Sequence, residues 1–379
     1  MLGRYLAGAA LARTGDELSG PAVLLLGISV TGTPGAASAL LTGLTASSAL
    51  GGPVFGAFLD RVARPGLLLA ATLAWYALGL ALVLLALGHL PLPAVVTLAV
   101  VTGLGNPAVS GGWTSQLPAA PGDLPRATAL DAATFNVASL AGPALAAVVA
   151  DRFGAATAVA VAAAMMALAM PAAWSLPARR TSRGRAHWTA GLTVLVRRRA
   201  LLRATVTSTI SYGGLGMVVV CYPLVGASRL GGASRGALLL AVVAGAALLT
   251  DAVLARRPWR GRPDTLVFAS TVVLATSAVG TALGGPVLLV LSAVLAGLAE
   301  GPQLTALFAV RHREAPEHLR AQVFTIGASV KITGFAAGTA LGGALAGSPT
   351  TCLLAVAAVQ LAAAAAYAAV RTPSPVRGA

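Results

Sequence analysis

The chain has 379 residues, of which 57% are hydrophobic and 10% are charged, and its net charge is +15. Soluble domains carry about 25% charged residues, so this composition excludes a soluble globular protein and indicates a membrane protein. The positive charge does not indicate a nucleic-acid-binding protein, because the arginines alternate from loop to loop instead of forming one basic surface.

Twelve apolar stretches are long enough to span a bilayer, since a helical span needs about 20 residues. They lie near 4–30, 37–59, 66–87, 94–117, 126–150, 154–174, 201–226, 236–254, 265–283, 287–309, 320–346 and 351–370. No alternating amphipathic strands occur in the sequence, which disfavours a barrel. The predicted fold class is all-α, with twelve transmembrane helices.

The second half of the chain repeats the plan of the first. GLGNP at 103–107 and APGDLPRA at 120–127 recur as GLAEGP at 297–302 and APEHLRA at 315–321. In each copy a charged corner joins two apolar helices that polar residues interrupt midway. Such repetition predicts two pseudo-symmetric six-helix bundles, 1–174 and 201–379, joined by a basic cytoplasmic linker, 175–200. The second bundle ends in a short cytoplasmic tail.

The basic residues fix the expected orientation. Of the 26, only Arg152, Arg229 and Arg235 fall on the side opposite the N-terminus, and Lys331 lies inside a span. By the positive-inside rule, both termini are expected in the cytoplasm, with the protein in the cytoplasmic (inner) membrane.

The first span contains three charges, Arg13, Asp16 and Glu17. Arg13 faces Asp16 at i+3 and Glu17 at i+4, so we expect these residues to neutralise part of the charge within the helix. One of the two acids then remains without a neutralising charge, and intramembrane acids typically carry proton or ion traffic. The alternatives are a structural ion cluster, or a span that begins later and leaves these residues at the interface.

The second span ends in a short motif made of Gly56, Asp60, Arg61 and Arg64. Gly-x-x-x-Asp-Arg-x-x-Arg between helices two and three resembles the signature of the major facilitator superfamily (MFS). With twelve spans, two halves and a basic central loop, the resemblance covers almost the whole chain. It implies the MFS fold, alternating access, and a cytoplasmic latch in which the aspartate engages a neighbouring helix. The alternative is that the arginines only anchor topology.

Helices four and five carry Asn106 and Asn136, both expected near mid-membrane. Asp131 lies five residues past Arg126 and is interpreted as an interfacial charge. Gly142-Pro143 resembles the Gly-Pro element of the superfamily's antiporters, although alanines stand where the fuller pattern has glycines. These alanines are Ala138, Ala146 and Ala147.

The linker holds Trp188, Leu192 and Leu195 at i, i+4 and i+7, which predicts a short amphipathic helix on the inner face. Its arginines, among them Arg179, Arg180, Arg183 and Arg185, are suited to anionic headgroups. The two cysteines, Cys221 and Cys352, lie in apolar runs without metal-ligand spacing.

In the second half, Glu300 and Gln303 share one face of helix ten, and Lys331 lies in helix eleven. Glu300 and Lys331 are each 11 residues from the corner that joins their helices, so both lie roughly 16 Å from it. Equal depth predicts an ion pair, because a lone charge inside the membrane is costly. The pair is either a structural bridge or a site where substrate or proton competes.

The sequence therefore predicts a secondary transporter, and we expect proton-coupled export of a small amphipathic compound. The alternative within the same fold is a proton symporter or facilitator that imports a small nutrient. A non-transporting receptor or scaffold is a third possibility, disfavoured by the absence of a long soluble loop. An enzyme is not expected, since all four histidines lie in or near loops. We expect a monomer in the lipid bilayer, without metal, cofactor or nucleic acid.

Overall fold

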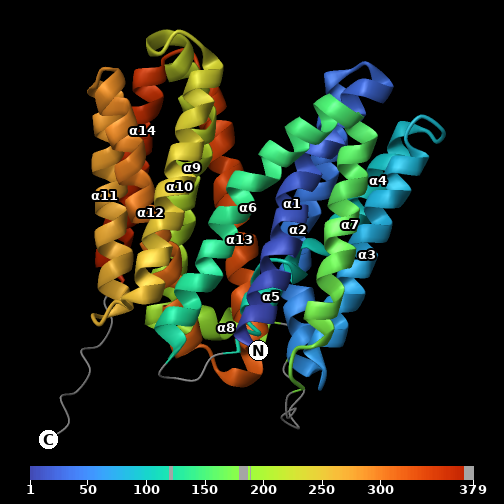
Figure 1. Ribbon diagram of the computed structural model, residues 1–379. Helices are drawn as coiled ribbons and strands as arrows, with labels where there is room; N and C mark the ends of the chain where they lie inside the picture. The colour runs from blue at the N-terminus through green and yellow to red at the C-terminus, as the bar shows by residue number, and fades with distance from the viewer. Residues whose placement is uncertain (119–122, 179–186, 188, 371–379) are drawn as a thin grey trace, which may run out of the picture. The chain divides into compact units, whose positions relative to one another are not determined.

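The computed structural model describes residues 1–118, 123–178, 187 and 189–370, and these are almost entirely helical (Figure 1). Among the described residues, ten helices are long and apolar enough to cross a membrane, and a shorter apolar helix runs through Gly35–Thr45. The first helix, α1 (Leu2–Thr31), is not one of the ten, because its charged residues lower its hydropathy. The protein is thus an all-α, multi-pass membrane protein, and the twelve spans stay a prediction.

The chain forms two compact units. The first comprises Met1–Gly191 and Pro316–Ser329, and the second comprises Leu192–Ala315 with the chain from Val330 onward. A segment of about a dozen residues late in the chain therefore groups with the first unit.

The first unit is built around α1, which packs against two later helices of the unit, α6 and α7. Its apolar core includes Tyr5, Leu18, Tyr76 and Trp113, all nearly inaccessible. Its helices after α1 are α2 (Pro34–Arg61), α3 (Pro65–Ala86), α4 (Leu92–Gly103), η1 (Asn106–Ala108), α5 (Gly111–Thr114), α6 (Leu124–Phe153), α7 (Ala155–Trp174), η3 (Glu317–Leu319) and the first residues of α13 (Arg320–Ala344).

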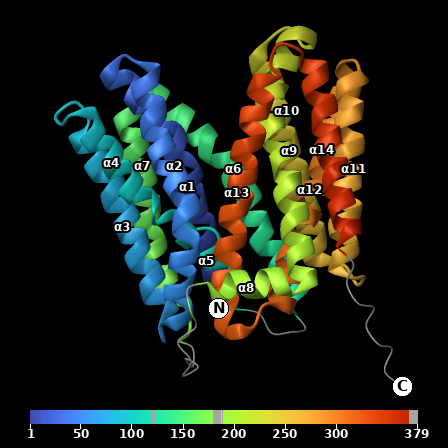
Figure 2. The same cartoon turned by 180° about the vertical axis from the view of Figure 1, so that it is seen from behind.

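In the second unit, α11 packs against α12 and α14, and α9 packs against α10 and α14 (Figure 2). Cys221 on α9 and Cys352 on α14 form a disulfide, a pairing that spacing alone did not indicate. Its helices are α8 (Ala190–Arg197, apart from its first two residues), α9 (Arg199–Arg229), α10 (Ala233–Arg256), α11 (Pro263–Leu283), α12 (Pro286–Glu314), the rest of α13, and α14 (Pro349–Ala369).

Prolines and glycines set many of the helix boundaries. Five of the helices begin with proline as their first residue, where the missing N–H would have no helical partner in any case. Gly32 ends α1 in the left-handed conformation, with φ 67°, which costs a glycine little. These signals explain why the predicted spans and the observed helices agree closely.

The fourth span departs from a continuous helix. Helix α4 ends at Gly103, and the chain passes through η1, which contains Asn106 and Pro107, before the short α5. Proline supplies no backbone donor and disrupts a regular helix, which accounts for the interruption at Pro107. This break places Asn106 in irregular backbone inside the first unit.

The linker helix is only partly described. Helix α8 contains Leu195, which is buried, and Leu192, which is 48% exposed. Trp188, the other member of the predicted apolar stripe, lies outside the described residues, as do Arg179, Arg180, Arg183 and Arg185 and the tail from Arg371 onward.

Candidate functional site

Arg13 is the centre of a buried polar cluster in the first unit. Its Nη1 donates to Asp131 Oδ1 at 2.8 Å, and its Nη2 donates to Thr114 Oγ1 at 2.8 Å. Nη1 also donates to Thr134 Oγ1, and the guanidinium lies over the ring of Phe135. The prediction that Arg13 pairs with its helical neighbours was therefore wrong: a side chain from α6 takes that place.

Asp131 is fully buried in the protein interior, and its interfacial depth in the membrane stays a prediction. It accepts a hydrogen bond from the Tyr5 hydroxyl at 2.9 Å in addition to the Arg13 bond. Its second oxygen, Oδ2, has no hydrogen-bond partner among the residues that the structure describes. Position along the helix gave a shallow depth, but the packing of α1 against α6 decides the environment.

Asp16 is half-buried and is held by two neutral donors. The Tyr76 hydroxyl donates to Asp16 Oδ1 at 3.0 Å, and Asn106 Nδ2 donates to the same oxygen at 2.6 Å. Ser19 Oγ lies 3.2 Å from the Tyr76 hydroxyl and extends the network. The interruption of the fourth span thus serves to bring an amide to an acid on α1.

Glu17 is an exposed residue next to the closest approach of α6 to α1. A Cβ at Gly142 would lie 2.5 Å from Glu17 Cβ and 2.9 Å from the Glu17 carbonyl carbon. Only glycine fits there, and Pro143 follows directly, so the Gly-Pro element sets the contact between the two helices. Asn136, two turns earlier on α6, is buried.

The predicted latch motif contacts the start of α13 within the first unit. Asp60 Oδ1 accepts from the backbone N–H of Ala321 at 2.9 Å, and Oδ2 accepts from that of Gln322 at 2.8 Å. The carboxylate therefore satisfies two of the orphan donors at a helix N-terminus, where the helix dipole also favours a negative charge. A Cβ at Gly56 would lie 2.7 Å from Gln322 Cα, so this approach requires glycine.

The two arginines of the motif are exposed. Arg61 is the last residue of α2, and Arg64 immediately precedes α3. The glycine and the aspartate of the motif both contact α13.

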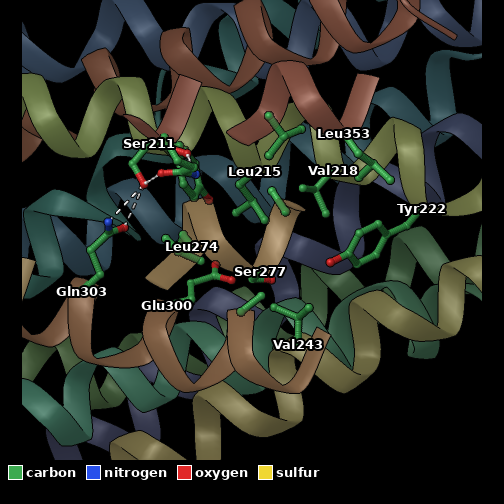
Figure 3. Close-up of a pocket in the computed structure, with 15 residues that line it drawn as sticks. Ser211, Leu215, Val218, Tyr222, Val243, Leu274, Ser277, Glu300, Gln303 and Leu353 are labelled. Atoms are coloured by element: carbon green, nitrogen blue, oxygen red, sulfur yellow. Dashed lines mark hydrogen bonds between the residues drawn. The ribbon is translucent and has the colours of Figure 1, made fainter. Parts of the chain in front are cut away.

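The second unit contains a cavity among α9, α10, α11, α12 and α14 (Figure 3). It offers about 40 Å³ for the centres of water molecules, enough for roughly three of them. Its lining is mostly apolar with a few polar side chains, a composition typical of small-molecule sites. The polar ones are Ser211, Tyr212, Tyr222, Ser277, Glu300, Gln303 and Gln360.

An amide network closes one end of this cavity. Gln303 Nε2 donates to Ser211 Oγ at 3.1 Å (Figure 3), and Ser211 Oγ donates to Gln360 Oε1 at 2.7 Å. Gln303 Nε2 also donates to Thr271 Oγ1 at 2.9 Å. Gln360 Nε2 in turn donates to the Ser211 carbonyl at 2.9 Å. The network ties α9, α11, α12 and α14 together inside the membrane.

Glu300 and Lys331 do not form the predicted ion pair. None of the salt bridges within 4.0 Å among the described residues joins them, although each charge acts on the other through space. The Lys331 ammonium instead lies over the ring of Tyr212, with Nζ 4.0 Å from the ring centroid. Equal depth was insufficient, because the lysine side chain turns toward α9.

The chain matches the Major Facilitator Superfamily over residues 5–278. It belongs to that superfamily. Its members are transporters rather than enzymes, so the fold supports secondary transport of a small molecule. No curated protein sequence matches this chain.

Solved structures of other superfamily transporters share this fold. The chain is similar to a bacterial homologue of the iron transporter ferroportin in its outward-facing state, with TM-score 0.77, 13% identity, and 97% of this chain and 98% of that chain covered. It is similar to the transporter FucP in its outward conformation, with TM-score 0.76, 15% identity and 98% of each chain covered. It is also similar to the human organic anion transporter MFSD10, with TM-score 0.72, 16% identity, and 97% and 98% covered.

Several residues of these sites escaped the sequence analysis of this MFS chain. Gln360 is the single amide of an otherwise apolar last helix, which was a usable signal. Tyr76 gave no such signal in the sequence, because a tyrosine in an apolar helix is ordinarily a core residue. The hydroxyl-rich start of α9 was noticeable, but only packing shows that Ser211 joins the amide network.

Proposed function

We propose that this protein exports a small amphipathic compound across the cytoplasmic membrane in exchange for protons, by alternating access. The observation that carries the proposal is the pair of adjacent acids, Asp16 and Glu17, inside the first unit. Their helical neighbour Arg13 is committed to Asp131. Neither acid forms a salt bridge within the described part of the chain, and the two donors to Asp16 are neutral.

Adjacent carboxylates without a cation are costly in a membrane, and binding a proton removes one negative charge. Asp16 has two hydrogen bonds that hold its charged form, whereas Glu17 is exposed beside Gly142. We therefore assign proton binding to this pair. Gly142-Pro143, which fixes α6 against α1 at Glu17, supports an exchange mechanism because it couples the same site to a second helix.

The latch is part of the same proposal. Asp60 and Gly56 hold the N-terminus of α13, a contact whose formation and release would shift the balance between transport states. Both termini are assigned to the cytoplasm, the basic linker 175–200 joins the two six-helix bundles, and the protein works as a monomer.

The test is transport in proteoliposomes with an imposed pH gradient, over a panel of amphipathic compounds. Asp16→Asn or Glu17→Gln should remove the pH dependence of transport while leaving substrate binding in place. Asp151→Asn is the matched control, since that acid lies exposed near the end of α6. If both acid variants still concentrate substrate against a gradient driven by pH, the assignment is refuted. Movement of substrate and protons in the same direction would instead establish the importing symporter.

A further inference from the structure

The Glu300 carboxylate lies in the cavity of the second unit without a hydrogen-bond or salt-bridge partner among the described residues (Figure 3). Its side chain points into the space between Leu274, Ser277 and Val243 (Figure 3). A carboxylate in such a place is a strong acceptor that the protein itself does not satisfy.

The amide and serine donors around the cavity are already used. Gln303 and Gln360 spend their amide N–H groups on Ser211 and Thr271, and Ser277 Oγ donates to the Ser292 carbonyl at 2.7 Å. An anionic ligand would therefore find few free donors, whereas a cationic ligand finds an unsatisfied carboxylate. The polar lining selects for positive charge.

An aromatic ring in the wall already holds an ammonium group. Lys331 Nζ lies 4.0 Å from the centroid of the Tyr212 ring, a cation–π geometry. Lys331 is also within electrostatic reach of Glu300 and of the like charge of Arg311. The lysine thus supplies a positive charge near this site. The like charge of Arg311 opposes that of the lysine.

We propose that this cavity binds a small amphipathic organic cation, whose ammonium group contacts the Glu300 carboxylate and competes with Lys331 for the Tyr212 ring. The apolar part lies among Leu215, Val218, Val243, Leu353 and Val356, which line the rest of the cavity. The limited volume restricts the ligand to a short chain of a few non-hydrogen atoms. This assignment names the substrate class of the export function proposed above and rests on it.

The test measures binding to the purified full-length protein in detergent, without any gradient. Three probes share one short branched chain and differ in charge: isobutylamine, isobutanol and isobutyrate. The amine should bind about tenfold more tightly than the other two, the difference expected for one desolvated charge contact. Equal affinities, or a preference for the carboxylate that Lys331→Met removes, would overturn the proposal.

Variants then locate the contact. Glu300→Gln should reduce amine affinity to that of the alcohol, whereas Glu314→Gln, at the end of the same helix, should not. Lys331→Met should tighten amine binding, because the internal competitor is gone. Tyr212→Phe should keep the preference and Tyr212→Leu should weaken it. Retention of the amine preference in a folded Glu300→Gln protein would refute the site.

Two outcomes separate this site from the export proposal. If Glu300→Gln does not fold, the three-probe comparison on the unaltered protein decides alone. Tight, Glu300-dependent binding without proton-driven transport of the amine would sustain the site and refute the proposed exchange. Proton-driven export of other compounds without any preference for the amine would refute the site and sustain the proposed exchange.

Discussion

The buried pair of Arg13 and Asp131 offers the sharpest test of the first unit. Breaking one side of such a pair typically costs about 3–5 kcal/mol, because the other charge stays buried without compensation. The two sides are not equivalent here. Without Asp131, Arg13 keeps the Thr114 and Thr134 hydroxyls and the carbonyls of residues 109 and 131. Without Arg13, Asp131 keeps the Tyr5 hydroxyl as its side-chain donor.

We therefore expect Arg13→Met to cost about 5 kcal/mol and Asp131→Asn about 3 kcal/mol or less, the upper and lower ends of that range. The double variant Arg13→Met/Asp131→Asn should lose much less than the sum, since it removes both charges together. The assay is thermal unfolding of purified protein in detergent, followed by tryptophan fluorescence, with Trp113 fully buried beside the cluster.

The matched control is Glu17→Gln, which changes an acid on the same helix that makes no salt bridge within the described residues. It should not lower the melting temperature. Strictly additive losses in the double variant, or a loss from Glu17→Gln as large as that from Asp131→Asn, would refute the pairing and restore the expectation that Arg13 pairs within its own helix.

Three further predictions follow from the other contacts. Asp60→Asn should cost about 1–2 kcal/mol of stability at the start of α13 and should impair transport. Gly56→Val should lower both stability and transport further, which a stability assay and a transport assay can show. Normal transport in both variants would leave the motif only a role in topology. Gln360→Leu should lower the melting temperature, because it leaves Ser211 and Gln303 with fewer partners, and an unchanged value would contradict the amide network. Single cysteines at Gly32 and Gly284 should react with an external impermeant reagent and those at Arg64 and Glu317 should not; the reverse pattern would invert the assigned orientation.

The fold was accessible from the sequence because a bilayer imposes simple rules. Apolar length marks the spans, arginine placement orients them, and a proline or glycine marks many of their ends. The Asp60 motif was equally readable, since its local spacing carries both the close approach at Gly56 and the helix-capping carboxylate. The resemblance implied only a neighbouring helix as the partner, and the structure identifies it as the start of α13.

The partners of the intramembrane charges were not accessible in this way. Counting residues from a helix end gives the depth of a side chain but not the direction in which it points. The depth of Asp131 therefore did not reveal its burial in the protein, and the equal depths of Glu300 and Lys331 did not make them an ion pair. The i+3 and i+4 rule favoured Asp16 and Glu17 for Arg13, although a helix 118 residues later supplies the partner. Only tertiary packing selects between neighbours of equal depth.

The sequence distance between Arg13 and Asp131 also bears on biogenesis. Helix α1 leaves the ribosome before the helices that supply its partners, and its charges meet them in the order of synthesis: Tyr76 after 60 residues, Asn106 after 90 and Asp131 after 118. At about 5–20 residues per second, Arg13 waits on the order of ten seconds for its carboxylate. Each unpaired charge costs at least about 2.5–3.5 kcal/mol at the centre of the bilayer during that interval. Helix α1 must therefore stay beside the insertion machinery or at the membrane surface until α6 emerges, and a gene split between α5 and α6 would leave the arginine dependent on a partner supplied in trans.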